Sequence, residues 1–221
     1  MLIAKNKIKY IEGIRGLAAI IVVLHHYTLA FYPALNFGDP NQTNFDNGNI
    51  ELLIANTPFN LIYNGGFAVS VFFILSGFVL SNSYHQGQNT HIITSYAIKR
   101  YVRLFVPVSV TIIISYIFIK AGFMTNSNLG EITKSRDWLN GAFTVDLGIY
   151  DVIKNMFVDV FFLKDNKYNP VLWTMTYELL GSFLLFAFLL IIHPLKNKNI
   201  LFITLISVLF FTKNEFYAAF I

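Results

Sequence analysis

Arg15, His25 and His26 are ionisable side chains inside an apolar stretch near the start of the chain, RGLAAIIVVLHHY. Such groups are costly inside a bilayer and usually face a protein interior or a wet cavity. An α-helix turns about 100° and rises about 1.5 Å per residue, so His26 shares the face of Arg15 roughly 16 Å further along, whereas His25 points about 80° away. At neutral pH a histidine can accept a proton from a hydroxyl group and return it later. His26 is therefore the candidate general base.

Glu178, in the stretch PVLWTMTYELLGSF, is the comparable acid of a later apolar segment. If that helix enters the membrane near Pro170, from the side on which the first helix ends, Glu178 lies about 12 Å deep and His26 about 10 Å deep. A carboxylate beside a histidine can orient the ring and stabilise the imidazolium. We therefore predict that His26 and Glu178 form a catalytic pair. The alternative is that each group only bridges helices through hydrogen bonds.

Arg100 and Arg103 lie one helical turn apart in the stretch IKRYVRLFVP. One interpretation is topological, because arginines at the inner end of a span extend their charged groups to the lipid headgroups. The other is phosphate binding, for which the planar guanidinium groups of paired arginines are well suited. Arg15 would join such a phosphate site from the first helix.

Two further side chains are candidates for ligand binding. Ser76 lies in GGFAVSVFFILSGFVLS, where small residues at helical spacing favour close helix packing, with a ligand role for Ser76 or Gly77 as the alternative. Trp173 either stacks on a sugar or anchors its helix at the membrane interface, as tryptophan often does.

The composition indicates which class of protein must position these residues. Of the 221 residues, 55% are hydrophobic and only 13% are charged, whereas a soluble domain has roughly a quarter charged. The chain therefore reads as an integral membrane protein. It contains no cysteine, which excludes disulfides, thiolate metal sites and thiol nucleophiles. No metal site is predicted, and the chain has no nucleic-acid motif and no glycine-rich phosphate loop.

Apolar segments predict the spans, since a helix needs about 20 mainly apolar residues to cross a bilayer. Four segments qualify, roughly 11–32, 61–83, 104–123 and 171–193, and a fifth, 200–212, is shorter. The stretch 150–163 is interrupted by Asp151, Lys154 and Asp159 and is expected to form an interfacial or re-entrant helix. The predicted fold is all-α: a polytopic transmembrane helix bundle of about five spans in a single domain, 1–221.

The distribution of basic residues predicts the orientation, because Lys and Arg accumulate on the cytoplasmic side. The 33–60 loop has acidic residues but no Lys or Arg, and the 124–170 loop is mixed, so both are expected outside and the N-terminus inside. Three basic clusters are expected inside: Lys5, Lys7 and Lys9, then Lys99, Arg100 and Arg103, and finally Lys196 and Lys198.

Four motifs follow one another in a recognisable order. They are an R-G-x-A run ending in His (Arg15 to His26), FF-x-x-SGF (Phe72 to Phe78), R-x-x-R with a following Pro (Arg100 to Pro107), and W-[ST]-[LM]-x-x-E (Trp173 to Glu178). Each motif is weak alone, but together, over about residues 10–185, they resemble the membrane-bound acyltransferase 3 family.

The resemblance implies an enzyme of the bacterial inner membrane that O-acylates exported glycans, antibiotics or lipids. It implies acyl-CoA, with acetyl the expected acyl group, as a co-substrate on the cytoplasmic side, and no permanently bound cofactor. It implies His26 as the catalytic histidine, with Arg15, Arg100, Arg103 and Glu178 as functional residues. The expected partners are membrane lipid, acyl-CoA and an extracytoplasmic glycan or lipid-linked acceptor, without nucleic acid.

The length departs from the family pattern. The chain stops at Ile221 after about five spans, whereas the resemblance implies ten helices and some 130 further residues, so it is expected to be half to two-thirds of the usual length. The alternatives to an acyltransferase are a non-enzymatic membrane carrier, since a basic mouth and a buried His and Glu also suit proton-coupled anion transport, and an inactive fragment.

Overall fold

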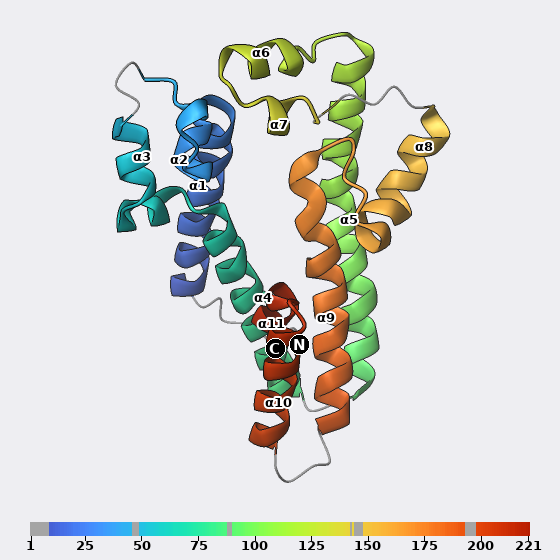
Figure 1. Cartoon of the computed structure of the whole chain (residues 1–221). Helices are drawn as coiled ribbons and strands as arrows, with labels where there is room; N and C mark the ends of the chain where they lie inside the picture. The colour runs from blue at the N-terminus through green and yellow to red at the C-terminus, as the bar shows by residue number, and fades with distance from the viewer. Residues whose placement is uncertain (1–8, 46–48, 88–89, 142, 144–147, 193–197) are drawn as a thin grey trace.

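A computed structural model describes residues 9–45, 49–87, 90–141, 143, 148–192 and 198–221. These residues form helices and connecting turns, with no strand among them. The fold is an all-α helix bundle (Figure 1), as predicted. The predicted basic residues Lys5, Lys7 and Lys196 lie outside the described residues.

Four helices are long and apolar enough to cross a membrane. They are α1 (Lys9–Phe31), α4 (Gly65–Gly87), α5 (Thr90–Lys120) and α9 (Trp173–Ile192), which is preceded by the 3-10 turn η4 (Pro170–Leu172). Helix α10 (Lys198–Phe211), the fifth predicted segment, is apolar but shorter. In an apolar environment a helix satisfies the hydrogen-bonding groups of its own backbone, which is why these apolar segments form helices.

The third predicted span, 104–123, begins too late. Its spanning part starts at Ser95, and α5 continues through Arg100 and Arg103 without a break. The charged residues Lys99, Arg100 and Arg103 favour a loop before this span, because unpaired charge is costly in lipid. In the structure Arg100 faces a carboxylate of α9, so its charge is paired inside the bundle. Pro107 also lies within α5, as is tolerated in transmembrane helices.

The interrupted stretch forms α8 (Ile149–Lys154) and a continuing π-helix, η3 (Asn155–Leu163), which packs against α5 and α9. Their 15 residues span at most about 22 Å, less than the roughly 30 Å of a hydrocarbon core. This agrees with the predicted non-spanning helix. In a π-helix, backbone hydrogen bonds join residues five apart in the sequence. Lys154 and Asp159 have this separation, and their side chains form an ion pair in which Lys154 Nζ lies 3.3 Å from Asp159 Oδ1.

The buried side chains of the described residues form three groups, the third of which consists of Leu185, Phe186, Leu189 and Ile192 in the second half of α9. The first joins α5, α8, η3 and α9 through residues such as Ile112, Phe161 and Leu179. The second joins α4 and α9 to the short helix α11 (Glu215–Phe220) around Phe73 and Phe220. Gly77 and Gly181 allow α11 to approach, because a Cβ atom at these positions would lie 2.1 Å from the Phe220 carbonyl oxygen and 2.5 Å from its ring, respectively.

Short helices cover the end of the bundle at which α1 finishes (Figure 1). We call these helices the cap. It consists of α2 (Pro33–Phe37), η1 (Pro40–Gln42), α3 (Asn49–Ala55) and η2 (Pro58–Tyr63) from one segment, and α6 (Asn126–Ile132) and α7 (Arg136–Leu139) from another.

Hydrogen bonds tie the two segments of the cap to each other and to α1. Asn44 Nδ2 donates to the carbonyl oxygens of Phe31 (2.9 Å) and Thr133 (2.6 Å), and Ser135 Oγ donates to that of Leu29 (2.5 Å). The last carbonyl groups of a helix lack partners within it, so the cap completes the end of α1.

Candidate active site

A polar cluster lies between α4, α5 and α9 and consists of Ser76, Arg100, Glu178 and Ser182. Arg100 Nη2 and Ser76 Oγ (2.8 Å) both donate to Glu178 Oε1, and Arg100 Nε donates to Ser182 Oγ (3.0 Å). The side chains of Arg100 and Glu178 are only 11% and 13% exposed. Buried charge is tolerated when it is paired and hydrogen-bonded, and the cluster supplies both conditions.

The other two predicted arginines lie near this cluster. The positive charges of Arg15, on α1, and Arg103, on α5, both act on Arg100. Arg103 is exposed, and Arg15 is 25% exposed with Nη1 3.4 Å from Glu12 Oε1. The structure therefore places Arg15 and Arg103 within electrostatic range of Arg100, although Arg100 already shares its charge with Glu178.

His26 lies further along α1, beside the cap. Its Nδ1 is 2.8 Å from the Val22 carbonyl oxygen, and its ring centre is 5.9 Å from that of Trp138 on α7. A carbonyl oxygen can only accept, so Nδ1 carries the hydrogen of the neutral ring, and Nε2 carries the lone pair that could accept a proton. The arrangement thus holds His26 in the tautomer that a general base needs.

The expected pairing of His26 with Glu178 does not occur. His26 bonds to its own helix, whereas Glu178 Oε1 accepts from Arg100 and Ser76. Counting the helical rise from Pro170 put Glu178 near the outer membrane surface, whereas Arg100 was expected at the inner end of its span. Their ion pair places them at the same level, because α5 begins at Thr90 and carries Arg100 about 15 Å into the bundle.

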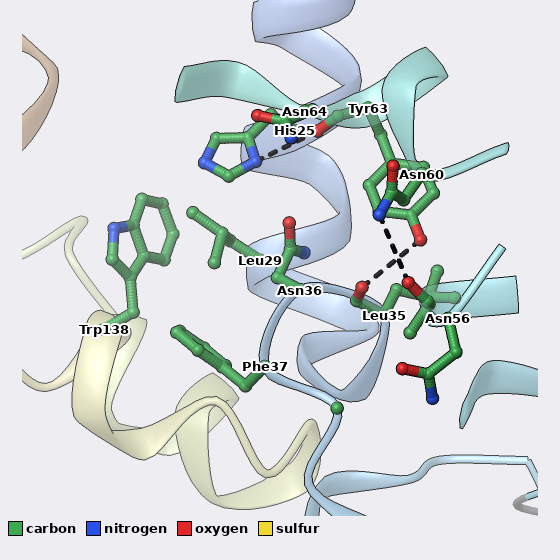
Figure 2. A pocket seen from close by; sticks show the side chains of 12 residues that line it. His25, Leu29, Leu35, Asn36, Phe37, Asn56, Asn60, Tyr63, Asn64 and Trp138 are labelled. Carbon is green, nitrogen blue, oxygen red and sulfur yellow. Dashed lines mark hydrogen bonds between the residues drawn. The ribbon is translucent and has the colours of Figure 1, made fainter. Parts of the chain in front are cut away.

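His25 lines a pocket of about 460 Å³ under the cap (Figure 2). Its Nδ1 is 3.1 Å from the Tyr63 carbonyl oxygen, so this ring is also held with Nδ1 as the donor. Tyr63 OH in turn donates to the Leu35 carbonyl oxygen (3.2 Å), and burial raises the pKa of its phenol. The lining residues are His25, Leu29, Leu35, Asn36, Phe37, Gly38, Ala55, Asn56, Asn60, Tyr63, Asn64 and Trp138.

The sequence did not predict this pocket. His25 points about 80° away from the face of Arg15, and the asparagines lie in short segments without helical periodicity, so neither indicated a binding site. One feature of the sequence could have indicated this pocket: Trp138, which lines it, is one of only two tryptophans in the chain. His25 and His26 face different features, and His25 faces the pocket. The two rings are nevertheless close to each other, with centres 5.4 Å apart.

Trp173 packs among aromatic rings at the start of α9. Its ring centre is 5.2 Å from that of Phe216 and 5.8 Å from that of Tyr177. Lys164 Nζ lies over the Tyr177 ring and donates to Tyr177 OH (3.0 Å), which raises the pKa of the Lys164 ammonium group. Trp173 thus joins α9 to α11 and is not among the residues that line the pocket. Within the described residues, no group of three or more His, Asp or Glu could hold a metal ion.

Comparison with known proteins places this bundle in a family. The family model described as an acyltransferase domain matches residues 8–214, nearly the whole chain. No curated protein and no solved structure matches the chain significantly. The match and the four apolar helices identify a membrane acyltransferase. The chain belongs to the acyltransferase 3 family.

Proposed function

We propose that the protein transfers an acyl group, with acetyl the expected one, from acyl-CoA to a hydroxyl of an exported glycan or lipid-linked sugar. The observation that carries this proposal is the separation along α1 of two side chains, Arg15 and His26. Arg15 lies within electrostatic range of Arg100 on α5, and His26 lies eleven residues further on, beside the cap. A site for phosphates and a site for proton transfer are thereby separated along one helix.

The donor would bind at the arginines. Guanidinium groups bind phosphate with two parallel hydrogen bonds, and such charge-assisted bonds are strong. Arg15 and Arg103 retain the exposure needed to meet the CoA phosphates, while Arg100 is held by Glu178. The extended arm of the donor would run along α1 for roughly 16 Å to bring the thioester to His26. Glu178 enters the proposal as a positioning residue that acts through Arg100.

The transfer step needs one base. His26 Nε2 accepts the proton of the acceptor hydroxyl as its oxygen attacks the thioester carbonyl carbon. The tetrahedral intermediate then collapses, the carbon–sulfur bond breaks, and the CoA thiolate leaves and takes the proton from the imidazolium. The carbonyl oxygen of Val22, 2.8 Å from Nδ1, keeps the ring oriented through both steps.

The proposed orientation is a multi-pass protein of the cell membrane, with the N-terminus in the cytoplasm and the cap outside. The lack of Lys and Arg in residues 33–60 supports it. Single cysteines can be introduced into this cysteine-free chain at Asn41, in the cap, and at Lys9, at the start of α1. An impermeant thiol reagent should label Asn41→Cys in intact cells and Lys9→Cys only after lysis. The reverse pattern would refute the orientation.

The function is tested with membranes that contain the protein and acetyl-CoA labelled in its acetyl group. Label should enter an exported glycan, and His26→Ala at the same membrane level should reduce the transfer to background. Uptake of label without covalent transfer would instead indicate a carrier. Absence of both would reject the activity for the chain as given.

A further inference from the structure

The pocket under the cap is lined by uncharged polar and apolar side chains. Four asparagines contribute to it, Asn36, Asn56, Asn60 and Asn64, and Trp138 closes one side (Figure 2). In the described part of the chain, no Lys, Arg, Asp or Glu lines it. Its volume of about 460 Å³ falls within the roughly 300–1,000 Å³ of small-molecule sites.

Hydrogen bonds to the cap and to α1 hold three of the asparagine side chains in place. Asn56 Nδ2 donates to the Leu52 carbonyl oxygen (2.9 Å) and Asn60 Nδ2 to that of Ala55 (3.3 Å). Asn36 Nδ2 donates to Thr28 Oγ1 (2.9 Å). A carboxamide has two N–H donors and an oxygen acceptor, so one bond fixes each group and leaves further capacity for a ligand. Fixed donors and acceptors of this kind match hydroxyl groups, which also donate and accept.

The imidazole of His25 packs directly against Gly65, where the side chain of any other residue would collide with the ring. A Cβ atom at Gly65, the first residue of α4, would lie 2.3 Å from His25 Cδ2 and 2.9 Å from Nε2. At the neighbouring Gly66 the nearest atom to such a Cβ is Asn64 Oδ1, at an ordinary 3.5 Å. With Nδ1 bonded to Tyr63, the second ring nitrogen of His25 lies on the side of Trp138 (Figure 2).

We propose that this pocket binds an uncharged, hydroxyl-rich ring, a neutral sugar residue, with His25 as a positioning residue that accepts a hydrogen bond from one of its hydroxyls. The ring stacks on Trp138, whose centre is 5.9 Å from that of His26, so the bound sugar lies next to the proposed base. A carboxylate or phosphate on the sugar would lose its hydration without gaining a countercharge, which is costly. This inference rests on the proposed function and specifies its acceptor.

The test uses Trp138 as a reporter. In a Trp173→Phe background, Trp138 is the only tryptophan, and its fluorescence is followed in the purified full chain during titration with methyl glucoside, methyl galactoside or N-acetylglucosamine. At least one of these neutral sugars should shift the emission, and glucuronic acid and glucose 6-phosphate should bind at least about tenfold more weakly. Equal or tighter binding of the charged sugars, or no response to any neutral sugar, would overturn the proposal.

Adjacent glycines supply a matched pair of variants. Gly65→Ala should weaken neutral-sugar binding about tenfold or more because it displaces the His25 ring, whereas Gly66→Ala should leave the affinity unchanged. In the acyl-transfer assay, His25→Ala should raise the KM for the acceptor with little change in kcat, and His25→Gln should restore part of the loss. A change in kcat alone, or equal effects of the two glycine variants, would reject the role of His25.

The two assays separate this inference from the proposed function. Sugar binding that depends on Gly65 but comes without transfer of label would leave the pocket standing and remove the acyl transfer. Transfer of label to an acceptor whose KM ignores both Gly65→Ala and His25→Ala would remove the pocket and leave the acyl transfer standing.

Discussion

Arg100 and Glu178 join α5 to α9 through a buried ion pair, and Ser76 adds a hydrogen bond from α4 to the same carboxylate oxygen. Three helices are therefore fixed to each other at one point. Such a group serves the fold as well as any ligand, so a variant of Arg100 that loses activity does not by itself identify a phosphate site.

The ion pair should show strong coupling between its partners. Glu178→Gln or Arg100→Gln leaves one charge buried without its partner, which typically costs about 3–5 kcal/mol, whereas removing both charges costs much less. The double variant should therefore unfold at a higher temperature than either single variant, as measured by thermal unfolding in detergent. Additive losses in the double variant would show that the pair contributes little.

Arg103 should report donor binding more cleanly than Arg100. Arg103→Gln removes an exposed charge and should weaken acyl-CoA binding about tenfold, since a hydrogen bond to a charged group is worth about 1.5 kcal/mol or more. Titration of acyl-CoA with the purified variant measures this. Lys120→Gln, at the C-terminal end of the same helix, is the control and should bind normally. If both variants bind normally, Arg103 takes no part in binding the donor.

The two histidines should differ in which kinetic constant they change. His26→Ala removes the proposed base and should lower kcat by about 10²–10⁴. His25→Ala should act mainly on the KM for the acceptor. Both are compared at equal membrane levels in the labelled acetyl-CoA assay. A severe loss of kcat in His25→Ala beside an active His26→Ala would exchange the roles of the two residues.

Glu51 should hold the cap together. It is fully buried, and its Oε1 accepts from the backbone N–H groups of Asn44 (2.8 Å) and Phe45 (2.9 Å). Glu51→Ala leaves both donors without that partner, and an unpaired donor costs roughly 1–3 kcal/mol where it is buried. Hydrogen exchange of residues 33–63 should accelerate in this variant. It should not change in Glu215→Ala, where the side chain is exposed, and unchanged exchange in both would contradict the assigned role.

Gly77 should tolerate no side chain. Its Cβ would lie 2.1 Å from the carbonyl oxygen of Phe220, a backbone atom that cannot swing aside. Gly77→Ala should thus displace α11 and lower the unfolding temperature in detergent. Gly13→Ala, on α1 with no atom within 4 Å, should be neutral or stabilising by up to about 1 kcal/mol because alanine favours helix. Similar unfolding temperatures for the two variants would argue against the packing of α11.

The sequence was sufficient for features that depend on one helix at a time. Long apolar runs predict α1, α4 and α9 because hydropathy dominates in lipid, and helical periodicity puts Arg15 and His26 on one face. It could not predict which residue pairs with Glu178, since the alignment of α5 against α9 is set by packing between helices. Nor could it predict the pocket, because the cap depends on bonds such as that from Asn44 to Thr133, 89 residues apart.

The carbonyl oxygen of Leu29, near the end of α1, is bonded by Ser135, which follows it by 106 residues. At a synthesis rate of roughly 5–20 residues per second, a ribosome makes Ser135 about 5–20 s after Leu29. Throughout that interval the first helix has been synthesised but its end lacks this partner, and the histidines near that end have neither Trp138 nor the second segment of the cap over them. The proposed base is therefore among the earliest parts of the molecule to be made and among the later ones to be enclosed.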